Sequence, residues 1–189
     1  MLPVAVPIGI LLGWLRRGRI ENLARLDGRA LGLVVAALLV RLGLERAPGA
    51  ATSPALLVAA EVVLYGGIFG AVAMHRRLRG VWLVGMGGAC NLLAIAMHGG
   101  RMPVWTAVAG RVAAAARAEL QAGTLLAHVA MARPQGLGWL GDVISLPAPL
   151  PAEVLSVGDL VLICGVVVFV ASAMATRPAG VSDRQASGA

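Results

Sequence analysis

Five long apolar runs, separated by short connections that carry many of the arginines, constrain this chain more than any other feature. The runs lie at about residues 2–15, 30–44, 54–74, 81–98 and 157–176. The chain is 59% hydrophobic and only 13% charged, whereas soluble domains carry about 25% charged residues. A helix needs about 20 apolar residues to cross a bilayer. The sequence therefore predicts an all-α integral membrane protein with about five transmembrane helices.

The arginines predict how these helices are oriented. All sixteen basic residues are Arg, and ten of them lie in the connections 16–29 and 75–80 and in the tail 177–189. Basic residues concentrate on the cytoplasmic side of a membrane. We therefore expect a bacterial plasma-membrane protein with its N-terminus outside and a disordered cytoplasmic tail. Residues 1–176 then form one transmembrane domain, and 101–156 form an extracytoplasmic excursion packed on the mouth of the bundle.

Short patterns predict where the helices begin and how they pack. Ser53 followed by Pro54 is typical of a helix start, and Ser156 with Asp159 resembles a capping box at the start of the last helix. Gly66-x-x-x-Gly70 favours close approach of a neighbouring helix. Residues 16–29 read as an interfacial helix on the cytoplasmic side. Arg41, near the far end of the second run, is interpreted as an anchor that reaches toward lipid headgroups.

The excursion has two parts. Residues 106–133 are Ala-rich and predict a helix with a polar stripe. The stripe consists of Arg117, Gln121, Thr124 and His128. The segment 138–151 contains Pro147, Pro149 and Pro151, which prevent a helix, so we expect an extended segment that covers the bundle mouth.

Polar residues within or beside the apolar runs are the candidates for a site. Glu61 lies roughly 10 Å into the third run, where an ionisable group suggests function; the alternative is a protonated carboxyl that hydrogen-bonds a neighbouring helix. Asn91 and His98 share one helix face. Asp142 needs a partner among His98, Arg101, Arg111 and His128. The candidate ligand-binding residues are Glu61, Asn91, His98, Gly99, Gly100, Arg101, Arg117, His128 and Asp142.

The sequence lacks the residues and motifs that several kinds of chemistry need. The chain has no Lys, which excludes Schiff-base chemistry and a P-loop lysine. No zinc-type Cys/His spacing, metalloprotease motif or serine-hydrolase motif occurs, so we expect no metal and leave a catalytic role open. Cys90 and Cys164 lie in separate apolar runs and read as inert thiols. The arginines lie between apolar runs, which indicates lipid headgroups as their partners and not nucleic acid.

A set of motifs recurs in one order along the chain. They are Asn91, Gly-Gly-x-Met-Pro-Val at 99–104, His128, Leu-Gly-Asp-Val-Ile at 140–144, and Ser-Val-Gly-Asp at 156–159. This order resembles a bacterial membrane-protein family known as domain of unknown function 5317. The resemblance implies an Asn just before the Gly-Gly pair, a position that His98 occupies here. It supports the topology and the motifs without supplying an activity or a cofactor.

These features lead to three functional hypotheses. The first is a membrane protein with a polar pocket at the extracytoplasmic mouth, which binds a lipid headgroup or a small anion or performs acid–base chemistry with His128 and Asp142. The second is a structural or accessory subunit whose small-residue helices dock a membrane-protein partner or a second copy of the chain. A transporter is the third, although no inverted repeat is visible.

Overall fold

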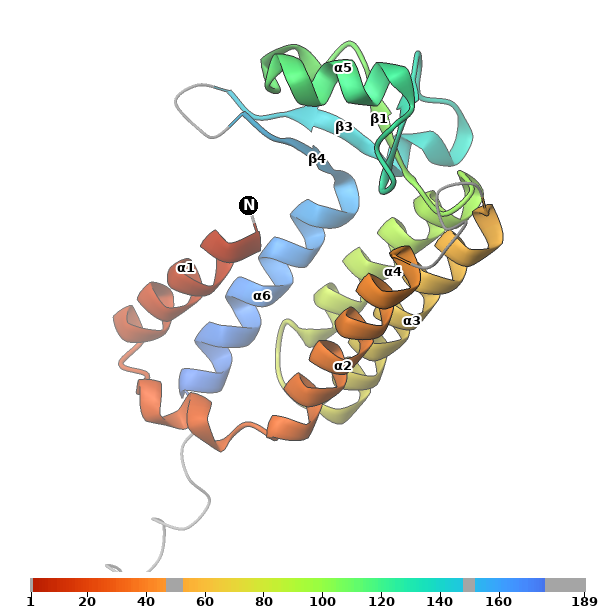
Figure 1. The fold of residues 1–189 in the computed structure, drawn as a ribbon. Coiled ribbons are helices and arrows are strands. Elements are labelled where there is room, and N and C mark those ends of the chain that lie inside the picture. Colours follow the sequence, from red (N-terminus) through yellow and green to blue (C-terminus); the bar gives the residue numbers. More distant parts are fainter. Residues whose placement is uncertain (1, 47–52, 148–151, 176–189) are drawn as a thin grey trace, which may run out of the picture.

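Five long helices lie side by side in the computed structural model, which describes residues 2–46, 53–147 and 152–175 (Figure 1). The helices are α1 (Leu2–Leu15), α2 (Gly28–Glu45), α3 (Pro54–Met74), α4 (Val81–Met97) and α6 (Val157–Ala175). Each lies within two residues of a predicted apolar run. The N-cap of α3 is the predicted one, because the Leu56 N–H donates to Ser53 Oγ at 3.3 Å.

The helices form a row in which α1 packs on α6, α6 on α4, α4 on α3 and α3 on α2. Helices α4 and α6 approach each other closely, because glycines of both helices lie at their contact. A Cβ on Gly87 would lie 2.5 Å from the Gly158 carbonyl oxygen, and one on Gly165 would lie 2.5 Å from the Val84 nitrogen. Small residues allow helix backbones to approach closely, and here they join the C-terminal helix to the centre of the row.

The contact between α2 and α3 uses a different glycine pair from the predicted one. Gly67 and Gly70 face Ala37 and Leu33 of α2, whereas Gly66 has open space around it. Residues three apart lie on one helix face as well as residues four apart do. The Gly66-x-x-x-Gly70 prediction is therefore right for Gly70, which faces α2, and wrong for Gly66, whose place at the contact is taken by Gly67.

A four-stranded sheet and a short helix cover one end of the bundle (Figure 1). We call residues 101–147 and 152–156 the cap. Its strands are β1 (Met102–Trp105), β2 (His128–Met131), β3 (Asp142–Ser145) and β4 (Val154–Ser156), in the order β2-β1-β3-β4. β1 is parallel to β2 and β3, and β3 is antiparallel to β4. The all-α prediction is therefore wrong for the cap.

The long helix predicted over 106–133 is also wrong. The structure has a 3-10 turn η3 (Ala109–Arg111), a short helix α5 (Ala114–Ala122), and then β2. Gly123 ends α5 with a φ of 71°, and its N–H donates to Glu119 and Leu120 carbonyls. Such a left-handed C-cap is a standard helix stop. His128 therefore belongs to a strand, and the predicted polar stripe does not exist.

The extended segment predicted over 138–151 is wrong at its start, because residues 138–140 belong to the 3-10 helix η4 (Gly136–Leu140), and right at β3; residues 148–151 lie outside the described part. At the opposite end of the bundle, the connection after α1 contains the 3-10 helix η1 (Ile20–Arg25) and not an amphipathic α-helix. The Arg19 N–H and the Asn22 side-chain amide donate to the Met174 carbonyl at 3.0 and 2.8 Å. This connection therefore holds the last turn of α6.

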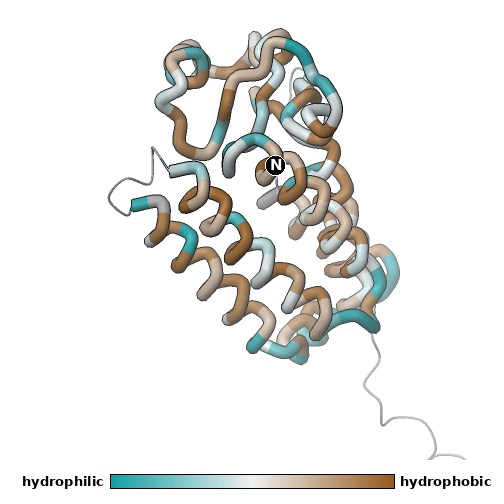
Figure 2. The backbone as a smooth tube through the Cα atoms, turned by 90° about the vertical axis from the view of Figure 1, so that its right-hand side faces the viewer, coloured by the Kyte–Doolittle hydropathy of each residue, from teal (hydrophilic) through white to brown (hydrophobic). Residues whose placement is uncertain are grey.

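The outer surface of the helices is strongly apolar. Figure 2 shows hydrophobic residues along the helices and hydrophilic ones at the turns and in the cap. Large exposed apolar side chains occur on all five helices; they include Leu11, Leu15, Leu31, Leu39, Val62, Trp82, Met97 and Leu160. By length and composition, α3 and α6 could each cross a membrane, while α4 and residues 4–15 of α1 are shorter apolar helices.

Candidate functional site

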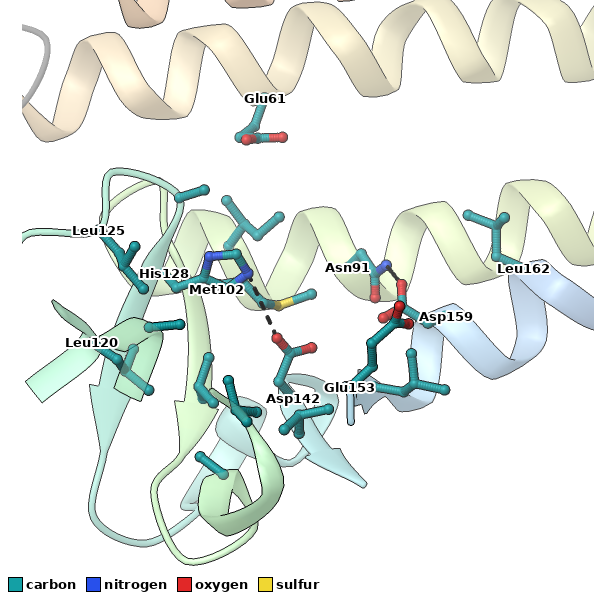
Figure 3. A pocket seen from close by; sticks show the side chains of 18 of the residues that line it. Glu61, Asn91, Met102, Leu120, Leu125, His128, Asp142, Glu153, Asp159 and Leu162 are labelled. Carbon is teal, nitrogen blue, oxygen red and sulfur yellow. Dashed lines mark hydrogen bonds and ion pairs between the residues drawn. The ribbon is translucent and has the colours of Figure 1, made fainter. Parts of the chain in front are cut away.

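A cavity of about 780 Å³ lies where the bundle meets the cap (Figure 3). This volume is within the range of about 300–1,000 Å³ that is usual for small-molecule sites. Helices α2, α3, α4 and α6 contribute to its walls, and so do α5 and all four strands of the cap. The polar and charged residues that line it are Arg41, Glu61, Tyr65, Asn91, Arg117, His128, Asp142, Glu153 and Asp159.

An ion pair between α2 and α3 forms one side of the polar lining. Glu61 Oε1 accepts hydrogen bonds from Nε and Nη2 of Arg41 at 2.9 and 2.6 Å. The two side chains are only 17% and 7% exposed. Arg41 therefore turns into the cavity and does not reach toward headgroups as predicted. Glu61 therefore does hydrogen-bond a neighbouring helix, as one of its two interpretations expected, and the donor is the guanidinium group of Arg41.

A hydrogen-bond network joins α4 to the start of α6. Asn91 Nδ2 donates to Asp159 Oδ1 at 2.8 Å, and Ser156 Oγ donates to Asn91 Oδ1 at 2.7 Å. The predicted capping box is confirmed: the Ser156 N–H donates to Asp159 Oδ2, and the Asp159 N–H donates to Ser156 Oγ. Asn91 is buried together with Ser156. It acts as the link between two helices and also lines the cavity.

Asp142 and His128 face each other across the central strand of the cap. Asp142 begins β3 opposite Val104, and His128 begins β2 opposite Met102. Met102 and Val104 are two residues apart on β1, so the side chains of His128 and Asp142 lie on the same face of the sheet. Their Oδ2 and Nε2 atoms are 3.8 Å apart (Figure 3). Among the predicted partners of Asp142 whose side chains the structure describes, His128 is the one that lies beside it.

Burial changes the proton affinity of both groups. Desolvation, with a smaller contribution from the negative charge of Asp159, raises the pKa of Asp142 from 3.8 to about 7. Desolvation also lowers the pKa of His128, and the positive charge of Arg41 lowers it further. Both changes disfavour the charged forms. A carboxyl group with a pKa near neutrality can exchange a proton under physiological conditions.

The pH dependence of stability follows from these shifts. Between about pH 4 and pH 7 the folded protein keeps a proton on Asp142 that the unfolded chain releases, so stability falls as the pH rises. The lowered pKa of His128 acts in the opposite direction below pH 6.5. We expect a net loss of stability over this range that is smaller than the roughly 4 kcal/mol that Asp142 alone would give. D142N should abolish this fall in stability and be more stable than the wild type at pH 8. Thermal unfolding in detergent across this pH range tests the prediction; a wild-type profile that matches that of D142N would contradict it.

The other predicted site residues do not all join this cavity. His98 does not line it; His98 Nδ1 lies 2.7 Å from the Ala94 carbonyl oxygen, at the end of α4. Arg101 also lies outside the lining and donates to the Gly123 carbonyl at 3.4 Å. Arg117 lines the cavity and donates to the Gly110 carbonyl at 3.2 Å. The side chain of Arg111, the fourth suggested partner of Asp142, lies outside the described residues.

The Gly-Gly turn has a structural role. Gly99 and Gly100 have φ angles of 68° and 83°, which other residues rarely adopt. The Gly100 N–H donates to the Ile95 carbonyl at 2.9 Å, and a Cβ on Gly100 would lie 2.6 Å from the Val58 nitrogen. The turn therefore ends α4 and packs closely against α3. The Gly100 N–H, already bonded, is not available to an anion.

Sequence reasoning did not assign Arg41, Tyr65, Glu153 and Asp159 to the site. One signal could have found Arg41: it lies four residues before the end of α2, and Glu61 lies seven residues after the start of α3. Two helices joined by a short connection are antiparallel, so these residues are at similar depth. Asp159 was recognised only as a helix cap.

Comparison with known proteins places the chain in a family. The model of a family of unknown function, DUF5317, matches residues 26–171. The chain belongs to this family. The match confirms the resemblance inferred from the motifs, and in this DUF5317 protein it runs from just before α2 to near the end of α6. No curated protein and no solved structure matches the chain. Within the described residues, no three His, Cys, Asp or Glu side chains gather as metal ligands would.

Proposed function

We propose that this protein is a multi-pass membrane protein whose five long helices cross the bilayer. Exposed large apolar side chains on every one of these helices support the proposal, because a water-soluble protein rarely exposes so much contiguous apolar surface. The arginine-bearing connections lie at the end of the bundle opposite the cap (Figure 1). By the positive-inside rule the cap is then extracytoplasmic.

The function that we propose is the binding of an amphipathic small molecule, such as a lipid, in the cavity beneath the cap. The observation that carries this proposal is the cavity itself, which combines apolar walls with a set of charged side chains at the outer end of the bundle. Sites for small molecules are mostly apolar with a few polar groups that fix orientation. A purely structural junction would be expected to fill this volume with side chains.

Filling the cavity should remove the bound molecule. Ala116 of α5 lines the cavity, whereas Ala118 of the same helix is exposed and does not. We expect protein purified in mild detergent to carry a stoichiometric amphiphile that solvent extraction and mass spectrometry detect. A116W should lose it by about tenfold or more because indole occupies the site, and A118W should keep it. Equal retention by the two variants, or no amphiphile in the wild type, would overturn the proposal.

A second candidate function is that of an accessory subunit in a membrane complex. A second hollow of about 550 Å³ lies between α3 and α4. Its lining consists of Phe69, Val72, Ala73, Trp82, Leu83, Gly85, Met86 and Ala89. Small and aromatic residues side by side favour close packing of another helix. Co-purification of a partner that Ala89→Phe releases and A118W does not would support this role; a clean monomer in mild detergent would count against it.

A further inference from the structure

Asp142 is a buried carboxyl group without a hydrogen-bond donor among the described residues. It is 7% exposed, and the Nε2 atom of its neighbour His128 is 3.8 Å away, beyond hydrogen-bond distance. Its side chain points into the cavity (Figure 3). The large majority of buried side-chain polar atoms have a hydrogen-bond partner. A donor supplied by a bound molecule would complete this group.

The charges around the cavity indicate the sign of that donor. Among the described side chains that line it, four are carboxyl groups, those of Glu61, Asp142, Glu153 and Asp159, and two are guanidinium groups, those of Arg41 and Arg117. Arg41 is already engaged with Glu61. Burial lowers the pKa of His128, so its imidazole adds little positive charge at neutral pH. The balance is negative, which favours a cation over the small anion that the arginines of the sequence suggested.

The apolar lining indicates what is attached to the donor. Below the charged residues the cavity continues between Leu64 and Ile68 of α3 and Leu162 and Ile163 of α6. These residues lie further from the cap along their helices than Glu61 and Asp159 do. Because the row of helices runs from α1 to α2 without closing on itself, an alkyl chain can lie between α3 and α6.

We infer that the ligand of this cavity is an amphiphile with a protonated amine, whose ammonium group binds the Asp142 carboxylate and whose alkyl chain lies between α3 and α6. This inference rests on the proposed function. Asp159, on the first turn of α6, adds negative charge beside the ammonium group. The ammonium group supplies a hydrogen-bond donor to Asp142. A charge-assisted hydrogen bond of this kind is stronger than one between neutral groups.

Three probes with the same alkyl chain separate this inference from its alternatives. Dodecylamine, dodecanol and dodecanoate differ only in their polar group, so binding of each to the protein in nanodiscs can be compared at about pH 8, where a primary amine is protonated. We expect the wild type to bind the amine about tenfold or more tightly than the alcohol, and the alcohol more tightly than the carboxylate. Equal binding of amine and alcohol, or tightest binding of the carboxylate, would overturn the inference.

Two variants locate the effect at Asp142. The ratio of amine to alcohol affinity cancels differences in how the probes partition into the bilayer. We expect D142N to lose about tenfold or more of this ratio. E119Q is the matched control, because Glu119 is an exposed carboxylate of the same cap that does not line the cavity. D142N with an unchanged ratio would contradict the inference, and the wild-type ranking decides it if D142N does not fold.

The outcomes also distinguish this inference from the proposed function on which it rests. If the alcohol binds as well as the amine and A116W abolishes both, the cavity binds amphiphiles without selecting an amine. If none of the three probes binds and no amphiphile co-purifies, the proposed function itself is wrong. If the wild type binds the amine selectively and both A116W and D142N abolish this selective binding, the result supports both the proposed function and the inference.

Discussion

We expect Arg41→Met to lower the free energy of unfolding by about 3–5 kcal/mol. The substitution leaves the Glu61 carboxylate, 7% exposed, without the guanidinium that now donates two hydrogen bonds to it. A buried charge that loses its partner keeps its full desolvation cost. Titration with sodium dodecyl sulfate in bicelles, followed by circular dichroism, measures the change.

Two further variants test this explanation. Arg46→Met removes an arginine from the C-cap of the same helix, where the side chain is exposed and donates only to the Leu42 carbonyl. We expect a change within about 0.5 kcal/mol for that variant. The double variant R41M/E61M should recover most of the lost stability, since both charges are removed together. If R41M and R46M are equally stable, Arg41 is not the buried partner of Glu61.

The helices of the bundle were predictable because their signals are local. Apolar runs bounded by arginines, the Ser53-Pro54 start and the Ser156–Asp159 capping box each lie within a few residues of the feature they specify. The helix that begins at Pro54 and the one that ends at Met97 therefore agree closely with the sequence. Among the described helices, α3 and α6 are the two that are long and apolar enough by themselves to cross a membrane.

The cap was not predictable in the same way because its contacts are distant in the sequence. Each strand has only three or four residues, and β1 pairs with β2 across the helix α5. A strand of that length gives almost no alternation to detect, while the Ala-rich segment favours a helix by propensity. Gly123 was the one local sign that the helix stops before His128.

The site was partly predictable because buried charges need partners. That argument correctly led from Asp142 to His128, although it could not choose among four candidates. It failed for Arg41, because an arginine near the end of an apolar run also suits a position at the headgroups. It failed again at His98, the C-cap residue of α4, whose Nδ1 atom lies against the Ala94 carbonyl oxygen of its own helix and not in the cavity.

We expect Gly165→Ala to destabilise the protein by about 3 kcal/mol or more. A Cβ at this position would lie 2.5 Å from the Val84 nitrogen and 2.9 Å from the Leu83 carbonyl carbon, both of which belong to the backbone of α4. Overpacking against side chains costs about 1–3 kcal/mol, and a backbone cannot change rotamer to make room. The helices must separate, which also lengthens the hydrogen bonds from Asn91 and Ser156 that join them.

Gly66→Ala provides the matched control for this substitution. Gly66 also lies within a long apolar helix, but nothing lies within 4 Å of a Cβ built there. Alanine is favoured over glycine in a helix by about 0.5–1 kcal/mol, so this variant should be as stable as the wild type or more stable. The same detergent titration compares the two. A loss of stability in G66A equal to that in G165A would show that glycine is needed for helix flexibility and not for the close approach of α4 to α6.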